Sequence, residues 1–231
     1  MHFDIRGEIE DQMAVSFRPV RVKEGKRPDA RKADEMILWG RIFDRLYMAP
    51  YVEGKGSAGN MAFRAPNGIC ITPSGGALGS LRADEIMTVV DVKEDGGGLS
   101  VLFYGHPGKA PSSETLIYWD IFKRRRDVNA VLHGHDSICL EKTDAIRKIF
   151  PADVSETRKA TDAGSFDFVE EMRGILSGSN RYLVGKGHGF FALGKDFEEA
   201  GLLALKLRTE ATGLLLGKKF MDGLKEKYDI S

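Results

Sequence analysis

The chain has 231 residues, 42% of them hydrophobic, which is long enough for one large domain with a substantial core. Its 34 basic and 34 acidic residues cancel, so the sequence carries no electrostatic signature of a nucleic-acid partner. Two cysteines, Cys70 and Cys139, lie in apolar runs and are too few for a disulfide framework. The start lacks the apolar core of a signal peptide, and no stretch is apolar for long enough to span a bilayer. We therefore expect a cytoplasmic protein with no membrane association.

The first half of the chain predicts one helix and then several strands. Residues 13–17 alternate apolar and polar side chains like a short strand, which Pro19 then interrupts, and a loop follows at residues 23–29. Residues 33–48 keep apolar side chains at helical spacing. Strand-like runs follow at the ranges 68–72, 86–92 and 99–104, with a hairpin turn at residues 95–98.

The second half predicts alternating helices and strands. Ser112 or Ser113 can cap a helix that stops near the basic run 123–126, whose cations we interpret as a solvated helix end that complements the helix dipole. Further elements follow in chain order: a strand at 128–133, one or two helices within 143–177, short strands at 182–185 and 190–193, and a long amphipathic helix from 200 to 215 that packs on the core. This order predicts a single α/β domain over residues 1–231, layered α/β/α around a central, largely antiparallel sheet.

Three histidines stand where a metal ion can use them. His133 and His135 are two residues apart, so both imidazoles point to one face of an extended strand. A lone His-x-His pair is more often a partly buried strand pair. Adding His188 gives three neutral nitrogen ligands with a fourth position open, as in catalytic Zn²⁺ sites, although another divalent transition metal also fits.

Small and hydroxyl residues predict an anion site near these histidines. Two glycine-rich turns, at residues 59–60 and 74–75, are segments in which successive N–H groups can converge on an anion. The helix N-terminus at residues 112–113 adds hydroxyls and free N–H donors. For the glycines, turn geometry alone is an equally good explanation. The candidates for binding one phosphate are Gly59, Asn60, Ser74, Gly75, Ser112 and Ser113.

Five short motifs occur in an order that resembles the class II aldolase/adducin family. They occupy residues 59–64, 71–75, 111–114, 133–135 and 188–189, and their spacing fits the sugar-phosphate aldolases typified by fuculose-phosphate aldolase. The resemblance runs from about Arg31 to the last long helix, and residues 1–30 are an unmatched extension. It implies that the six candidates bind the substrate phosphate, that the three histidines hold the metal, and that Glu114 shuttles the proton on the carbon beside the carbonyl.

The activity that the resemblance implies is a zinc-dependent lyase. It would split a ketose 1-phosphate into dihydroxyacetone phosphate and an aldehyde, with zinc stabilising the enediolate charge where it develops. Dehydration of methylthioribulose 1-phosphate and 4-epimerisation of a pentulose 5-phosphate are alternatives on the same scaffold; the epimerases tend to have aspartate in place of Glu114. A non-catalytic, adducin-like interaction module would have lost the ligands or the glutamate, and this chain keeps all four residues.

The chain departs from the family pattern at two positions. Tyr118 stands where a histidine is common, and Gly187 stands where an asparagine is common. Tyr228 resembles in position a tail tyrosine that donates a proton in some family aldolases. No nearby motif recognises the aldehyde end of the substrate, so a neighbouring subunit can supply that wall, and the resemblance implies a cyclic homotetramer with the site near a subunit boundary. Residues 13–22 are expected either as an extra contact or as part of the chain's own sheet.

Overall fold

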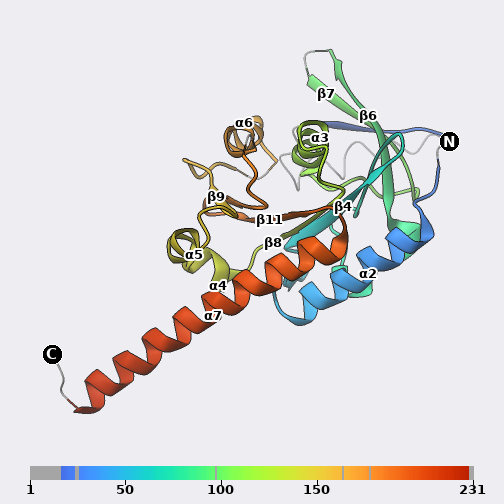
Figure 1. Ribbon diagram of the computed structural model, residues 1–231. Coiled ribbons are helices and arrows are strands. Elements are labelled where there is room, and N and C mark those ends of the chain that lie inside the picture. The colour runs from blue at the N-terminus through green and yellow to red at the C-terminus, as the bar shows by residue number, and fades with distance from the viewer. Residues whose placement is uncertain (1–16, 24–25, 97, 163, 177, 229–231) are drawn as a thin grey trace.

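The centre of the molecule is a nine-stranded mixed sheet, seen in a computed structural model that describes residues 17–228 except 24–25, 97, 163 and 177, with backbone alone beyond residue 219 (Figure 1). The strand order across the sheet is β1-β7-β6-β5-β4-β8-β11-β10-β9. Only the outer pairs, β1 with β7 and β9 with β10, are parallel, which confirms the expectation of a largely antiparallel sheet. The strands are β1 (Arg18–Arg21), β4 (Gly59–Ala65), β5 (Gly68–Ile71), β6 (Met87–Asp95), β7 (Gly98–Tyr104), β8 (Ala130–Gly134), β9 (Val154–Glu156), β10 (Tyr182–Gly185) and β11 (Gly189–Gly194).

Helices cover both faces of this sheet, so the predicted α/β/α layering is confirmed (Figure 1). One face carries α2 (Ala30–Arg45) and α7 (Phe197–Tyr228), and the other carries α3 (Thr115–Arg124) and α6 (Phe166–Ile175). Two short helices, α4 (Ser137–Glu141) and α5 (Thr143–Ile149), lie near β9. Neighbouring strand residues face opposite layers: Phe190 belongs to the core under α2 and α7, and Phe191 to the core under α3 and α6.

The long helix α7 packs on the sheet with its first half only. Its fully buried residues, Ala200, Ala204, Leu207 and Ala211, recur every three or four positions and form one stripe. Beyond Ala211 the helix extends away from the body of the molecule (Figure 1), so the expectation of core packing as far as residue 215 is wrong for the last turn. No helix in the described part of the chain is both long and apolar enough to cross a bilayer.

Several predicted elements differ from those observed. Pro19 lies inside β1 rather than ending a strand, which is possible because β1 is an edge strand; of the predicted strand 13–17, residues 13–16 lie outside the described part. The strands β4 and β9 were not predicted, nor was a small hairpin of β2 (Tyr51–Val52) and β3 (Gly56–Ser57). These segments are short or rich in small and polar residues, so they lack the apolar alternation that identifies a strand.

Candidate metal centre and active site

His133 occupies a central position of the sheet. It lies in β8, directly opposite Asn60 of β4 on one side and Phe191 of β11 on the other. Its side chain is fully buried, and its ring stacks on the Phe191 ring with centroids 4.2 Å apart. The Nδ1 atom is 2.7 Å from the carbonyl oxygen of Phe190, so Nδ1–H donates to that oxygen and leaves the lone pair on Nε2 for a metal ion.

The other two histidines converge on the same point. His135 lies one residue beyond the end of β8, with its Nε2 atom 3.0 Å from Nε2 of His133. His188 sits in the turn between β10 and β11, where its N–H donates to the Gly185 carbonyl at 2.9 Å. The preceding residue, Gly187, has a φ of 71°. Asparagine tolerates this left-handed conformation better than other residues with a side chain. This explains how the turn can have glycine here and the asparagine that the family pattern has at position 187.

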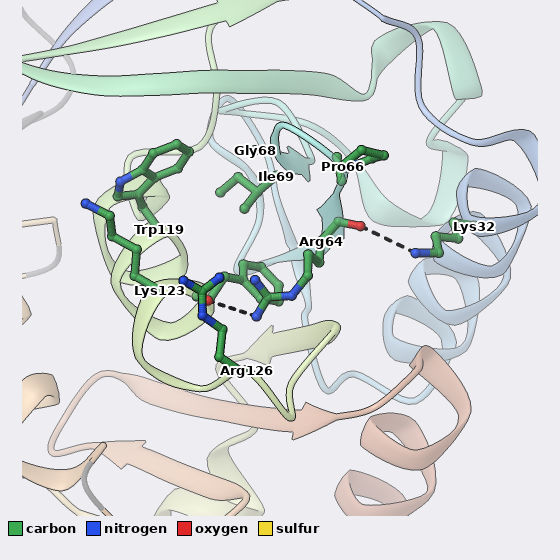
Figure 2. Close-up of a pocket in the computed structure, with 10 residues that line it drawn as sticks. Lys32, Arg64, Pro66, Gly68, Ile69, Trp119, Lys123 and Arg126 are labelled. Atoms are coloured by element: carbon green, nitrogen blue, oxygen red, sulfur yellow. Dashed lines mark hydrogen bonds between the residues drawn. The ribbon is translucent and has the colours of Figure 1, made fainter.

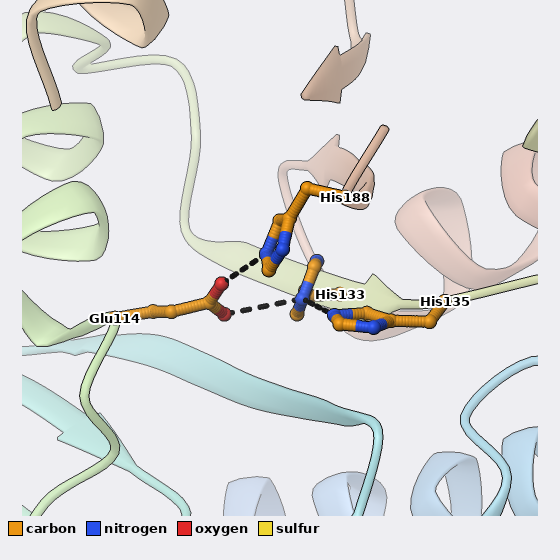
Figure 3. A group of neighbouring side chains, drawn as sticks. All are labelled: Glu114, His133, His135 and His188. Atoms are coloured by element: carbon orange, nitrogen blue, oxygen red, sulfur yellow. Dashed lines mark hydrogen bonds and ion pairs between the residues drawn. The ribbon is translucent and has the colours of Figure 1, made fainter. Parts of the chain in front are cut away.

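Glu114 completes the group from α3, which lies on the same side of the sheet as the Phe191 ring that stacks on His133. It is the N-cap residue of α3 and its side chain is buried. One carboxylate oxygen, Oε1, is 2.5 Å from Nε2 of His188, and Oε2 is 3.1 Å from Nε2 of His133. The ligand atoms of Glu114, His133, His135 and His188, called here the histidine–glutamate cluster, all lie within 4.8 Å of one another (Figure 3).

The electrostatics of this cluster suit a cation. Burial raises the pKa of Glu114, but the neighbouring His133 and His188 together with Asn60 outweigh burial and lower that pKa to about 2. Burial lowers the pKa of His133 to about 3 and that of His135 to about 4, so both imidazoles are neutral at pH 7. Neutral imidazoles and an ionised carboxylate are the ligands that a divalent transition metal uses.

A close approach of two acceptor atoms supports the same conclusion. With its proton on Nδ1, His133 presents a lone pair at Nε2, and that lone pair faces the negative Oε2 of Glu114 at 3.1 Å. Two lone pairs at this distance repel unless a proton or a metal ion is shared between them. The donor set therefore fits a metal ion held by three imidazole nitrogens with the carboxylate beside it.

The predicted phosphate residues occupy three neighbouring segments. The turn with Ser74 and Gly75 follows β5 and lies against the segment before α3: Ser74 N–H donates to the Ala110 carbonyl at 2.9 Å, and Ser112 N–H donates to the Thr72 carbonyl at 3.2 Å. Two loops that are far apart in sequence are thus side by side. Gly75 has a φ of 65°, so its turn needs a residue without a side chain.

The sequence indicated a turn at Gly59 and Asn60, and this prediction is wrong: both residues lie in strand β4. A Cβ atom on Gly59 would lie 2.5 Å from the His133 carbonyl oxygen, so the glycine allows β4 to pack closely on β8. The Asn60 side chain points to the cluster, where its amide N–H donates to Oε2 of Glu114 at 2.8 Å. The structure therefore brings Asn60 to the catalytic candidate as well as to the neighbourhood of the phosphate candidates.

The two serines before α3 do not cap it. The helix begins at Thr115 with Glu114 as the N-cap, and no side chain caps the N-terminal N–H groups. Ser112 instead organises the preceding turn: its Oγ accepts from the Glu114 N–H at 3.3 Å and its carbonyl accepts from the Thr115 N–H at 3.0 Å. Backbone carbonyls also take the N–H of Ile117, which donates to the Glu114 carbonyl at 3.0 Å, so the first turn of α3 is held mainly by its own backbone.

Tyr118 is a residue of the site whose role the sequence did not reveal. It is fully buried, and its hydroxyl donates to Asn60, whose carbonyl oxygen is 3.0 Å away and whose side-chain oxygen is closer still. Burial, with a smaller contribution from Glu114, raises the pKa of Tyr118 well above its usual value, so the hydroxyl keeps its proton. Its place in the site could have been inferred from the sequence, because Tyr118 follows Glu114 by four residues and this spacing puts both on one face of α3.

Two other features singled out in the sequence do not join this group of residues. Tyr228 is the last residue of α7, and its side chain is beyond the described part of the chain. The basic residues 123–126 lie at the far end of α3 from Glu114. A mixed sheet between two helical layers, with three imidazoles and one carboxylate at a helix N-terminus, defines the class II aldolase fold.

Comparison with known proteins agrees with this class. The model of the family described as Class II Aldolase and Adducin N-terminal domain matches residues 35–212, so the chain belongs to that family, whose enzymes depend on a metal. A methylthioribulose-1-phosphate dehydratase from Methylococcus capsulatus is 29% identical over 73% of this chain and 85% of its own length. An L-fuculose phosphate aldolase from Methanocaldococcus jannaschii is 29% identical over 76% of this chain and 93% of its own length.

Solved structures show the same fold. The sugar-phosphate aldolase from Thermotoga maritima superposes with a TM-score of 0.64, covering 82% of this chain and 96% of that one at 16% identity. The chain is therefore an enzyme of the class II aldolase superfamily, and its relatives include both aldolases and dehydratases of sugar phosphates.

Proposed function

We propose that this enzyme is a metal-dependent sugar-phosphate aldolase that splits a ketose 1-phosphate into dihydroxyacetone phosphate and an aldehyde. The observation that carries the proposal is the histidine–glutamate cluster, in which three imidazole nitrogens and an ionised carboxylate lie within 4.8 Å. A non-catalytic interaction module has no use for a buried group of this kind, because burying a carboxylate against lone pairs destabilises the fold unless a ligand compensates.

His133, His135 and His188 would hold the metal ion, and Zn²⁺ is the ion that three neutral imidazoles favour, with another divalent transition metal as the alternative. When bound, such an ion supplies the positive charge that stabilises the enediolate left by cleavage of the carbon–carbon bond. The Phe190 carbonyl fixes the His133 ring, and the turn at Gly187 presents His188.

Glu114 is the proposed acid/base. At neutral pH it is a carboxylate, so it can accept the proton on the carbon beside the substrate carbonyl and return it in the reverse direction. The Asn60 amide donates to Oε2, and the Tyr118 hydroxyl donates to Asn60, so the half-buried Asn60 and the buried Tyr118 orient the carboxylate independently of the histidines. We propose Asn60 and Tyr118 as positioning residues for this proton transfer.

The substrate phosphate is proposed to bind where the two loops meet. The turn at Ser74 and Gly75 lies against the segment of Ser112 and Ser113, beside the N-terminus of α3, whose positive dipole end favours an anion. Gly59 and Asn60 lie in the strand that borders this region. Phosphate held there would fix the reacting carbon near Glu114, which is the gain that positioning provides.

A dehydratase acting on methylthioribulose 1-phosphate is the second candidate, because one relative with extensive coverage carries that name. Both reactions begin from a ketose 1-phosphate and both use a metal and a base, so product analysis must separate them.

Metal-loaded enzyme is incubated with fuculose 1-phosphate and with methylthioribulose 1-phosphate. An aldolase releases dihydroxyacetone phosphate, detected by a coupled reduction. A dehydratase instead yields a phosphate ester lighter by one water, detected by mass spectrometry. A third incubation, with a pentulose 5-phosphate, detects its 4-epimer. Absence of all three products would contradict an enzymatic role on these substrates.

We further propose a cyclic homotetramer with the site near a subunit boundary, and a cytoplasmic location. In support of the location, Cys70 and Cys139 are both buried free thiols. In support of the assembly, the part of α7 beyond Ala211 extends from the body of the molecule, where a neighbouring subunit can contact it (Figure 1). Light scattering at micromolar concentration tests the assembly, and a fully active monomer would contradict it.

A further inference from the structure

A second candidate site lies at the other end of α3 from Glu114. It is a cavity of about 430 Å³, called here the basic pocket, bordered by α3, the start of α2 and the turn between β4 and β5 (Figure 2). Four cationic side chains and no acidic one line it, together with two aromatic rings; these residues are Lys32, Arg64, Trp119, Phe122, Lys123 and Arg126. Lys123 lies nine positions after Glu114 along the helix, or about 13 Å, so the pocket is distinct from the histidine–glutamate cluster.

The four-residue basic run 123–126 divides into two pairs. Arg124 forms an ion pair with Asp120 at 2.9 Å, and Arg125 pairs with Asp127 at 2.8 Å. Lys123 and Arg126, in contrast, pair with none of the described carboxylates, and both line the basic pocket. The cations without an acidic partner are therefore those that face the cavity.

A cation from outside the basic run makes hydrogen bonds at the carbonyl end of α3. Arg64 reaches two of these carbonyls: its Nη2 donates to the Phe122 carbonyl at 2.8 Å and to the Arg125 carbonyl at 2.9 Å. The same guanidinium also donates to the Val128 carbonyl. The interpretation of residues 123–126 as a solvated helix end stays a prediction, and it gives no role to the position of Lys123 and Arg126 beside the cavity.

The charges in the basic pocket also oppose one another. Burial, and then the positive charge of Arg126, lower the pKa of Arg64, which means that the two guanidinium groups are close enough to repel. Figure 2 shows the two groups side by side on the same wall of the cavity. An anion placed between them would turn that repulsion into two attractive contacts.

The remaining walls are apolar and aromatic. Phe122 and Ile69 are buried and form the floor, and Trp119 is half-buried with the Lys123 ammonium 6.0 Å from its ring centroid. An indole face suits a planar group, and the volume lies within the range of small-molecule sites. We propose that the basic pocket binds a small organic phosphate, with the phosphate against Arg126 and Lys123 and a planar group against Trp119.

Tryptophan fluorescence tests this proposal. Trp119 borders the cavity, whereas Trp39 is buried between α2 and α7, so a ligand in the pocket changes the emission of Trp119 alone. Adenosine monophosphate and inorganic pyrophosphate serve as probes, with adenosine as the uncharged comparison. We expect saturable binding of adenosine monophosphate that weakens about tenfold or more in the K123Q/R126Q protein, because two charge-assisted contacts are lost. The matched control is Arg124→Gln, which removes a cation from the same run but outside the pocket, and should leave binding unchanged.

Further arms separate this site from the proposed active site. In the Glu114→Gln protein, binding of adenosine monophosphate should be unchanged while turnover falls, and the K123Q/R126Q protein should keep normal turnover. Calorimetry with the Trp119→Phe protein checks binding without the fluorescent reporter. Several results would overturn the proposal: no saturable binding, equal binding of adenosine, equal loss in the Arg124→Gln protein, or tighter binding of a single-stranded RNA oligonucleotide, which would indicate a nucleic-acid surface instead.

Discussion

The two ends of helix α3 present polar groups in opposite ways. At the N-terminus, Glu114, Asn60 and Tyr118 are linked in a chain of hydrogen bonds that reaches the histidines. At the C-terminus, Lys123 and Arg126 are exposed to solvent and have no carboxylate partner among the described residues. Burial is the physical difference. A buried polar group must have a defined partner, so the N-terminal end specifies one kind of ion, whereas exposed cations are solvated by water and specify only the charge of a ligand.

The largest expected effect comes from removing a metal ligand. His188→Ala should lose most of the bound metal and with it nearly all turnover, because two imidazoles hold a divalent ion far less tightly than three. Elemental analysis of the purified protein gives the stoichiometry. His106→Ala is the matched control, since His106 is a histidine outside the cluster and should retain the metal. Stoichiometric metal in the His188→Ala protein would remove His188 from the ligand set.

Removing the charge of the carboxylate should affect the reaction but not the metal. Glu114→Gln is nearly isosteric and should cut turnover by about 10²–10⁴-fold, the usual contribution of a positioned acid/base, with metal content close to normal. Steady-state kinetics and elemental analysis on one preparation measure both. The exposed Glu141 provides a control, because Glu141→Gln should change neither quantity. Normal turnover in the Glu114→Gln protein would show that another group moves the proton.

At the opposite end of α3, Arg64 donates to backbone carbonyls, and we expect these contacts to contribute to the free energy of unfolding. Arg64→Met keeps the aliphatic stem but leaves the carbonyls of Phe122 and Arg125 without their donor, at a cost of about 2–3 kcal/mol in the free energy of unfolding. Urea denaturation gives this value. Arg31→Met removes an exposed arginine and should cost less than about 0.5 kcal/mol. Equal stability of the two variants would contradict the capping role.

Tyr118 tests whether the orientation of Glu114 matters for the rate. Tyr118→Phe removes only the hydroxyl that fixes Asn60, so we expect kcat to fall about tenfold with KM and metal content nearly unchanged. A merely structural role would lower the melting temperature without this split between kcat and KM. Tyr104→Phe, in β7 at a distance in the sheet from β4, is the matched control. Unchanged kcat in the Tyr118→Phe protein would mean that Asn60 holds its position without the tyrosine.

The smallest effect is expected at the turn before His188. Gly187→Asn should change the free energy of unfolding by less than about 1 kcal/mol, because asparagine tolerates a positive φ and the new Cβ would meet only the Ala160 Cβ at 3.5 Å. Gly187→Val should cost more, since a β-branched residue disfavours this conformation. Thermal unfolding of the metal-free proteins compares them. Equal cost for both substitutions would show that the side chain meets an obstacle other than backbone strain.

Much of the fold was readable from local patterns. The strands β5 to β8 and the hairpin around His188 followed from apolar runs between turn residues, and α2 followed from helical spacing. The strand β4 did not, because its first residues, Gly59 and Asn60, look like a turn in isolation. They form a strand because β8 and β5 offer hydrogen-bonding partners on both sides, and such partners are remote in sequence.

For the site, the sequence by itself supplied the residue types: three histidines, one glutamate and a set of small residues in family order. The tertiary structure decided how they meet. Residues 60, 114, 133 and 188 come from a strand, a helix terminus, a second strand and a turn, and only the packing of α3 against the sheet places them within hydrogen-bonding distance. The Tyr118–Asn60 link and the unpaired cations of the basic pocket depend on three-dimensional neighbours. The sequence pattern carries periodicity along one chain segment, and it carries no information on which distant segment lies opposite.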